Sequence, residues 1–154
     1  MFRGTHHTAI STPDLARSLA FYRDLFGFEV ILEMDWPRGY AGADLIMGLE
    51  GTAAQAVMLR RADSMIEIFE FSSPAAKTQP LDRPVCDHGI NHFCFWVEGI
   101  QAEYERLSEA GMVFHCEPQD SGTGIVVTYG RDPDGNVIEL LEILDGEHPF
   151  HLDT

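Results

Sequence analysis

The sequence predicts an α+β fold built from two tandem βαβββ modules, and three observations support this prediction. In each half of the chain, a strand, a helix and about three further strands can be assigned. When the sequences of the two halves are aligned, His7 matches His92 and Leu15 matches Ile100. Between them, residues 72–90 contain prolines and no periodic apolar pattern, as expected of a surface linker. The predicted order is module one at about 5–71, the linker at 72–90, module two at about 91–143 and a tail at 144–154.

The first half begins with a short strand that leads into an amphipathic helix. Residues 6–11 read as the strand, and Thr12 followed by Pro13 predicts a helix start with a hydroxyl cap and a proline in the first turn. Gly27 suits the left-handed residue that ends a helix. The buried helix face is predicted to carry Leu15, Leu19, Tyr22 and Phe26. Strands are predicted near 28–32, 56–59 and 65–69.

The second half repeats this order. Residues 91–97 read as a strand, and a helix is predicted from about Gly99 to Gly111. The apolar face of this helix carries Ile100, Tyr104 and Leu107. Strands are then predicted near 112–115, 125–129 and 137–141.

Two histidines occupy matched positions in the first strands of the halves. Phe93, Phe95 and Val97 share the face under the helix, so His92 points to the other face. The same alternation turns His7 away from the helix and directs His6 back toward the apolar residues. A lone strand histidine is more often a hydrogen-bonded structural residue, but its recurrence in both halves favours a shared role.

Two glutamates are matched in the same way. Glu67 and Glu139 each lie in the last apolar strand of a half, where a carboxylate is costly unless it is paired, solvated or bound to metal. The turn at residues 131–136 has proline and glycine placed for a tight hairpin, which fixes the register and therefore the direction of Glu139. Two imidazole nitrogens and two carboxylate oxygens suit a divalent transition metal.

Composition limits the function classes. A chain of 154 residues with 45% apolar residues is sized for one domain, and its formal net charge of −15 disfavours binding to nucleic acid or to an anionic membrane surface. The N-terminal residues lack an apolar signal core, so we expect a soluble cytoplasmic protein. Cys86, Cys94 and Cys116 form no C-x-x-C pair and are expected to be buried free thiols.

The chain resembles the vicinal oxygen chelate (VOC) superfamily, also called the glyoxalase, bleomycin-resistance and dioxygenase family. The resemblance extends from His6 to about Ile143, and its most specific part is RDPDGNVIEL at positions 131–140. It implies that the modules form an open eight-stranded cup, with one divalent ion (nickel, cobalt, zinc, manganese or iron) on its floor. The implied metal ligands are His7, Glu67, His92 and Glu139. The resemblance also implies a small-molecule substrate and a homodimer.

Within that superfamily, the ligand pattern resembles the glyoxalase I and methylmalonyl-CoA epimerase branches. It implies a lyase or an isomerase/epimerase that chelates a small oxygenated substrate and moves a proton α to a carbonyl, with Glu139 as the base and Glu67 as the second candidate. The substrate contacts are expected from the variable stretch 33–54, including Arg38, and from Trp96 and Tyr129.

Two alternatives stay open. An extradiol-type dioxygenase would hold iron(II) with two histidines and one glutamate, and Glu67 counts against it because a fourth ligand removes a position that its chemistry needs. A metal-free drug-binding resistance protein would suit the acidic charge but would not need the four ligands. His148 and His151 in the tail have metal-like spacing, but an ordinary flexible end is the favoured interpretation.

Overall fold

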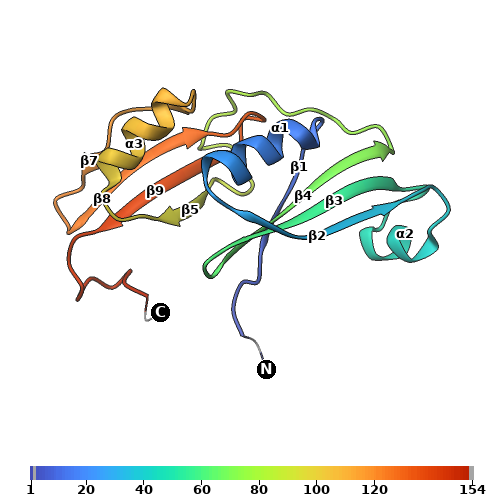
Figure 1. The fold of residues 1–154 in the computed structure, drawn as a ribbon, viewed down its shortest axis with the longest axis horizontal. Helices are drawn as coiled ribbons and strands as arrows, with labels where there is room; N and C mark the ends of the chain where they lie inside the picture. Colours follow the sequence, from blue (N-terminus) through green and yellow to red (C-terminus); the bar gives the residue numbers. More distant parts are fainter. Residues whose placement is uncertain (2, 153–154) are drawn as a thin grey trace. The chain divides into compact units, whose positions relative to one another are not determined.

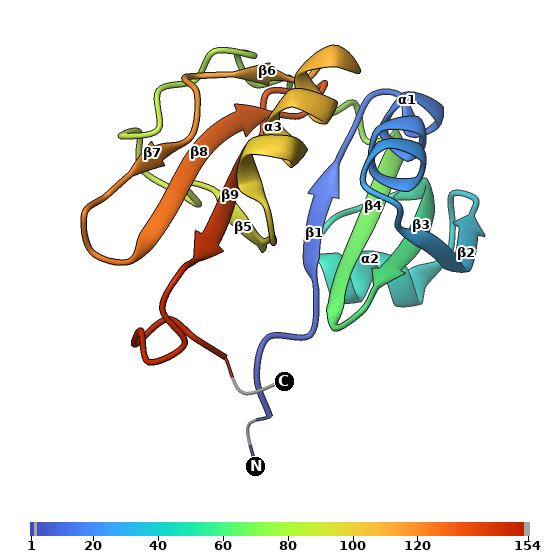
Figure 2. The same cartoon turned by 60° about the vertical axis from the view of Figure 1, so that its left-hand side comes forward.

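The computed structural model of the protein describes residues 1 and 3–152, and the chain divides into two compact units. Unit 1 is Met1–Thr78 and unit 2 is Gln79–Thr154. Each unit contains one mixed β-sheet with a helix packed along one face of it (Figures 1 and 2). The predicted α+β class with two tandem βαβββ modules is confirmed.

Unit 1 contains one helix more than the βαβββ pattern requires. Its elements are β1 (Thr8–Ser11), α1 (Leu15–Leu19), the π-helical η1 (Ala20–Leu25), β2 (Glu29–Trp36), α2 (Ala41–Met47), β3 (Ala53–Arg61) and β4 (Ser64–Ser73). The sheet order is β1-β4-β3-β2, in which β1 is parallel to β4 and the other pairs are antiparallel. The extra helix, α2, lies in the variable stretch 33–54, for which no helix is predicted from the sequence.

Unit 2 follows the same plan with a divided edge strand. Its elements are β5 (Phe93–Trp96), α3 (Ile100–Glu109), β6 (Val113–Phe114), β7 (Gln119–Asp120), β8 (Ile125–Arg131) and β9 (Val137–Ile143). The order is β5-β9-β8-β6, and β7 also pairs with β8. The single strand predicted near 112–115 is therefore followed by a second short strand. Pro118 lies between the two and has no N–H to donate to a continuous ladder.

The helices bury the predicted faces against the sheets. In unit 1, Tyr22 is fully buried and Phe26 nearly so, and Ile66 and Ile68 of β4 are buried as well. In unit 2, Leu107 of α3 is fully buried, as are Ile138 and Leu140 of β9. Figure 2 shows α1 and α3 each lying along its own sheet. The sheet face under each helix is thus the apolar core of the unit.

The first helix begins two residues later than predicted. The N-cap residue is Asp14, whose carboxylate accepts a hydrogen bond from the Arg17 backbone N–H at 3.0 Å. The expected cap, Thr12, is instead buried, and its hydroxyl accepts hydrogen bonds from the Asp14 N–H and the Ser18 hydroxyl. A carboxylate is favoured at this end because the helix dipole places partial positive charge there.

In each unit, a carboxylate from the last strand of the sheet binds the helix N-terminus. In unit 1, Glu70 Oε2 accepts from the Leu15 N–H at 2.7 Å. In unit 2, Glu142 accepts from the N–H groups of Gly99 and Ile100 at 2.5 and 3.1 Å. Gly99 has φ +68° and no capping side chain, so Glu142 alone caps α3.

The β8–β9 hairpin is closed by one aspartate. Asp132 Oδ1 accepts from the backbone N–H groups of Asp134 and Asn136 at 2.9 and 2.8 Å. Asp132 Oδ2 accepts from the Asn136 side chain at 2.8 Å. This turn sets the antiparallel register in which Tyr129 lies opposite Glu139.

The first residues of unit 2 pack on this hairpin. Gly135 has φ +82°, and a Cβ there would lie 2.6 Å from the Leu81 backbone. Arg131 Nη2 donates to the Arg83 carbonyl at 2.9 Å, and the Gln79 amide donates to Asn136 Oδ1 at 2.9 Å. Residues 79–83 are therefore held by unit 2 through specific contacts.

The cysteines do not behave as predicted. Cys86, Cys94 and Cys116 are all exposed, so the expectation of buried thiols is wrong. Cys86 and Cys116 lie in connections, and Cys94 lies on the face of β5 away from α3. In the described part of the chain, no helix combines the length and the apolar character needed to cross a membrane.

Replacing Glu142 should loosen α3. We expect Glu142→Ala to lower the free energy of unfolding by about 1–2 kcal/mol, because two backbone N–H groups lose a charged acceptor. Exposed Glu98, one residue before the helix cap, is the matched control, and Glu98→Ala should change the free energy by less than about 0.5 kcal/mol. Urea unfolding followed by circular dichroism measures both, and equal effects would contradict the capping role.

Candidate functional site

In unit 1, His7 and Glu67 converge on the sheet face away from α1. His7 lies directly before β1, and its Nε2 is 3.2 Å from Glu67 Oε2. The neighbours of Glu67 in β4, Ile66 and Ile68, are buried on the helix side, so alternation turns Glu67 to the other face. The Glu67 side chain is only 14% exposed.

Unit 2 repeats this arrangement with His92 and Glu139. His92 lies directly before β5, and its Nε2 is 2.9 Å from Glu139 Oε2. Buried Ile138 and Leu140 flank Glu139 in β9, and the Glu139 side chain is 16% exposed. Each unit therefore brings together one histidine and one glutamate with the same atoms facing each other.

The preceding residue holds the other ring nitrogen of each histidine. His7 Nδ1 lies 2.8 Å from His6 Nδ1, and His92 Nδ1 lies 2.7 Å from Asn91 Oδ1. Such a contact orients the ring and leaves Nε2 to face the carboxylate. His6 is exposed, so the expectation that it turns back toward the apolar residues is wrong. The sequence signal for these ring contacts was the polar residue, His6 or Asn91, directly before each matched histidine.

The donor set can be judged from each pair. One imidazole nitrogen and one carboxylate oxygen are ligands that zinc, nickel, cobalt, manganese and iron accept. Among the described residues, no group of three or more histidine, cysteine, aspartate or glutamate side chains is placed to hold a metal ion. Each pair by itself supplies two of the four predicted ligands.

On the face that carries Glu139, titratable side chains form a row across the sheet. Tyr129 of β8 and Cys94 of β5 are the register partners of Glu139 on its two sides. The Tyr129 ring lies 4.9 Å from the His92 ring and 6.4 Å from the His115 ring. Burial raises the pKa of Tyr129, and the nearby Glu139 and Cys94 raise it further. Tyr129 therefore stays a neutral hydroxyl beside the His–Glu pair.

His115 extends this row, although the sequence assigned it no role. Arg131 Nε donates to His115 Nε2 at 3.1 Å, and the His115 N–H donates to the Tyr129 carbonyl at 2.7 Å. Burial and the Arg131 charge lower the pKa of His115. Predicting the position of His115 would have required knowing that residues 113–115 pair with β8. No local sequence pattern reveals this pairing.

Cys94 is exposed as a residue, yet neighbouring atoms desolvate its thiol. This burial raises the pKa of Cys94 to about 12, and the charge and hydrogen bonding of adjacent Glu139 add to the effect. A thiol with that pKa remains protonated at neutral pH, so it can donate a hydrogen bond to the carboxylate.

Trp96 lies on the same face, one step along β5 from Cys94, and it is 39% exposed. Its ring contacts the His151 ring at a centroid distance of 5.1 Å. The tail reaches this position through backbone bonds from His148 to Asp145 and from His151 to His148. The tail up to Leu152 thus has hydrogen-bonded turns where a flexible end was expected, and Asp153 and Thr154 lie outside the described residues.

Arg38 does not lie among the neighbours of Glu67. It lines a hollow of about 600 Å³ together with Gln55 and Glu70, and Glu70 binds the N-terminus of α1. Arg38 therefore lies toward the helix side of the unit 1 sheet. Trp36, from the same variable stretch, also lines this hollow, and its ring contacts the Phe69 and Phe71 rings of β4 at centroid distances of 6.3 and 6.4 Å.

Comparisons with known proteins agree with this fold. The profile of the Glyoxalase/Bleomycin resistance protein/Dioxygenase superfamily matches residues 4–140. A probable lactoylglutathione lyase of Synechocystis sp. is 26% identical over 138 residues, covering 88% of this chain and 92% of that protein. An ethylmalonyl-CoA/methylmalonyl-CoA epimerase of Cereibacter sphaeroides is 29% identical over 142 residues, covering 90% and 96%. A glyoxalase family protein of Bacillus cereus superimposes with a TM-score of 0.83 at 21% identity, covering 94% and 97%.

The raised pKa of Cys94 predicts slow alkylation. Only the thiolate reacts, so at pH 8.5 we expect iodoacetamide to modify Cys86 and Cys116 well before Cys94 in the metal-free protein. The Cys94 rate should keep rising with pH beyond pH 10, and Glu139→Gln should speed it by removing the negative charge. Peptide mass mapping follows each thiol. Equal rates for all three at pH 8.5 would contradict this account.

Proposed function

Because the chain belongs to the Glyoxalase/Bleomycin resistance protein/Dioxygenase superfamily, we propose that it is a metal-dependent lyase or epimerase that moves a proton α to a carbonyl group. The observation that carries the proposal is that both units contain the same histidine–glutamate pair. These pairs are His7 with Glu67 and His92 with Glu139. Relatives named as a lactoylglutathione lyase and as an acyl-CoA epimerase support this reaction class.

The proposed cofactor is one divalent ion, namely nickel, cobalt, zinc, manganese or iron, held by His7, Glu67, His92 and Glu139. Each pair presents an Nε2 and an Oε2 that already face each other. Two largely buried carboxylates would balance the two positive charges of the ion, which offsets the cost of burying them. The two pairs can come from one chain or from two copies in a homodimer, and both arrangements give the same donor set.

When bound, the ion supplies Lewis acidity that makes the proton α to a chelated carbonyl more acidic. Glu139 is the proposed base. Its neighbours Cys94 and Tyr129 are neutral hydrogen-bond donors that can orient the carboxylate toward the substrate. The register partners of Glu67 are Ala9 and Met58, which offer no such donors, so we assign Glu67 to holding the cofactor.

Substitution of each proposed ligand should weaken metal binding. We expect His7→Ala, Glu67→Ala, His92→Ala and Glu139→Ala each to lower metal affinity by more than about 100-fold, since even outer partners of metal ligands contribute 10–100-fold. Metal content is measured by mass spectrometry on protein purified without a metal-binding tag. Exposed His88 and Glu98 are the matched controls, and His88→Ala and Glu98→Ala should keep the wild-type content.

The pattern of losses also tests the alternatives. If only Glu67→Ala retained metal, a three-ligand iron dioxygenase would replace the lyase or epimerase proposal. If wild-type protein took up none of the five metals, metal-free drug binding would become the leading reading.

The base assignment makes a separate prediction. In D₂O, the loaded protein should exchange the α-proton of methylmalonyl-CoA or of lactoylglutathione for deuterium, measured by proton NMR. Glu139→Gln should slow this exchange by about 100-fold or more, because the amide cannot accept the proton. Because Glu139 is also a proposed metal ligand, parallel metal analysis of the variant separates loss of the base from loss of the cofactor. If Glu67→Gln were the slow variant and Glu139→Gln were unaffected, the two roles would be reversed.

A further inference from the structure

The sheet faces that carry the two His–Glu pairs differ in chemistry. In unit 2, the register partners of Glu139 are Tyr129 and Cys94, both titratable. In unit 1, the register partners of Glu67 are Ala9 and Met58, and the next residue of β4 on this face is Phe69. One pair therefore lies among hydrogen-bonding groups, and the other lies among apolar ones.

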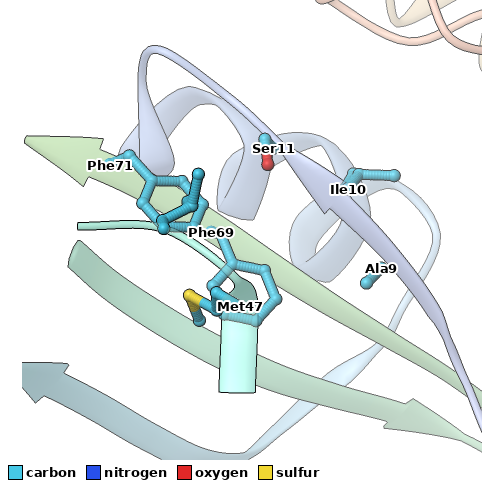
Figure 3. Close-up of a pocket in the computed structure, with 7 residues that line it drawn as sticks. Ala9, Ile10, Ser11, Met47, Phe69 and Phe71 are labelled. Atoms are coloured by element: carbon cyan, nitrogen blue, oxygen red, sulfur yellow. The ribbon is translucent and has the colours of Figure 1, made fainter. Parts of the chain in front are cut away.

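The apolar surroundings of Glu67 include a pocket of about 260 Å³, shown in Figure 3. Ala9, which lies beside Glu67 in the sheet, forms one wall, so the pocket adjoins the His7–Glu67 pair. Figure 3 shows Met47 at the end of α2 next to the Phe69 ring. This apolar pocket is lined by Ala9, Ile10, Ser11, Met47, Leu49, Phe69 and Phe71.

The aromatic wall of the pocket is held by other aromatic rings. Phe69 and Phe71 are stacked, with ring centroids 5.7 Å apart and an angle of 16° between the planes. Trp36 contacts both rings edge-on. The Trp36 indole N–H donates to the Thr52 hydroxyl at 3.1 Å, which fixes the position of this ring.

The wall from α2 is anchored through the same threonine. Asp44 of α2 accepts hydrogen bonds from the Gly51 N–H, the Thr52 N–H and the Thr52 hydroxyl at 2.9, 2.7 and 2.6 Å. These hydrogen bonds lower the pKa of Asp44, so the anchor stays charged at neutral pH. Met47 is one turn further along α2, so both walls are held in place without a ligand, which reduces the entropy cost of binding.

We infer that the apolar pocket binds an apolar side group of the substrate, either a short alkyl chain or one aromatic ring, next to the carbonyl group that the proposed function assigns to the metal. The part of this inference that concerns the substrate oxygens rests on the proposed metal site. The volume of about 260 Å³ is below the range of about 300–1,000 Å³ for sites of drug-sized ligands, so only a small group fits. Ser11 is the one polar side chain among the lining residues, so a polar group would lose its water without gaining partners.

The first test uses metal-loaded protein and a series of 2-hydroxy acids, from lactate to 2-hydroxyhexanoate and 3-phenyllactate, with affinity measured by calorimetry. Each added methylene should tighten binding about fourfold until the pocket is full. Ser11→Leu fills the pocket and should flatten the series, whereas Met47→Ala should extend it to longer chains. Ala16→Leu, which adds the same kind of group on the exposed surface of α1, is the matched control and should leave the series unchanged.

The second test needs no metal. Benzyl alcohol is titrated into metal-free protein labelled with ¹³C at the methionine methyls, and the Met47 signal is assigned from Met47→Leu. The Met47 signal should shift with benzyl alcohol, while that of Met112, buried in the unit 2 core, should not. Ser11→Leu should abolish the Met47 shift.

The two tests separate the inference from the proposed function. If the protein held no metal but Met47 responded and Ser11→Leu blocked the response, the pocket would stand and the proposed function would fail. If lactate bound only with metal, and neither chain length nor benzyl alcohol had any effect, the proposed function would stand and the pocket would be overturned.

Discussion

The register of the last strand in each unit fixes both the start of the helix and the direction of the site carboxylate. Glu67 and Glu70 are three positions apart in β4, so they face opposite sides of the sheet. Glu70 binds the N-terminus of α1 while Glu67 faces His7. A slip of one residue would point Glu67 into the apolar core and remove the hydrogen bond from Glu70 to the helix N-terminus. Helix docking and site geometry therefore depend on each other, and Glu139 with Glu142 repeats the constraint in unit 2.

Local patterns in the sequence predicted the parts of this arrangement that depend on alternation and end signals. The strand periodicity placed Glu67 opposite Ile66 and Ile68, and Gly27 ends the first helical segment with φ +72° as its position suggested. The roles of Glu70 and Glu142 were missed because each one binds a helix start that is far away in sequence. No local sequence pattern indicates which distant residues will form these hydrogen bonds.

Other features could not be read from the sequence for similar reasons. The helix α2 carries exposed Leu45 and Ile46 and lacks the clean amphipathic pattern that reveals a surface helix. Its position depends on Asp44 bonding to residues 51 and 52, which is a tertiary contact. The position of Cys94, by contrast, could be read from the sequence, because the alternation of Phe93, Phe95 and Val97 turns Cys94 to the face away from α3. Apolar composition alone suggested burial, and it was misleading there.

The repeat of the fold is more faithful than the repeat of its surfaces. Both units keep the histidine before the first strand and the glutamate in the last one. Around these pairs, unit 1 has Met58 and Phe69, while unit 2 has Tyr129 and Cys94. Buried positions under the helices are constrained by packing in both units, whereas the face away from the helix is free to differ. Two copies of one scaffold thereby present one apolar surface and one surface with titratable side chains.

The contacts between residues 79–83 and the β8–β9 hairpin change where the chain can be divided. Composition alone would treat the whole proline-containing connection as a tether, and any point along it would be an equal place for a nick. Arg131, however, uses the Arg83 carbonyl as an acceptor, and the missing side chain of Gly135 leaves room for the Leu81 backbone. A break before Gln79 leaves this packing complete, whereas a break after Arg83 removes it from the hairpin that orients Glu139. Residues 79–83 of the apparent tether are thus part of the folded unit, and protease resistance should begin at Gln79.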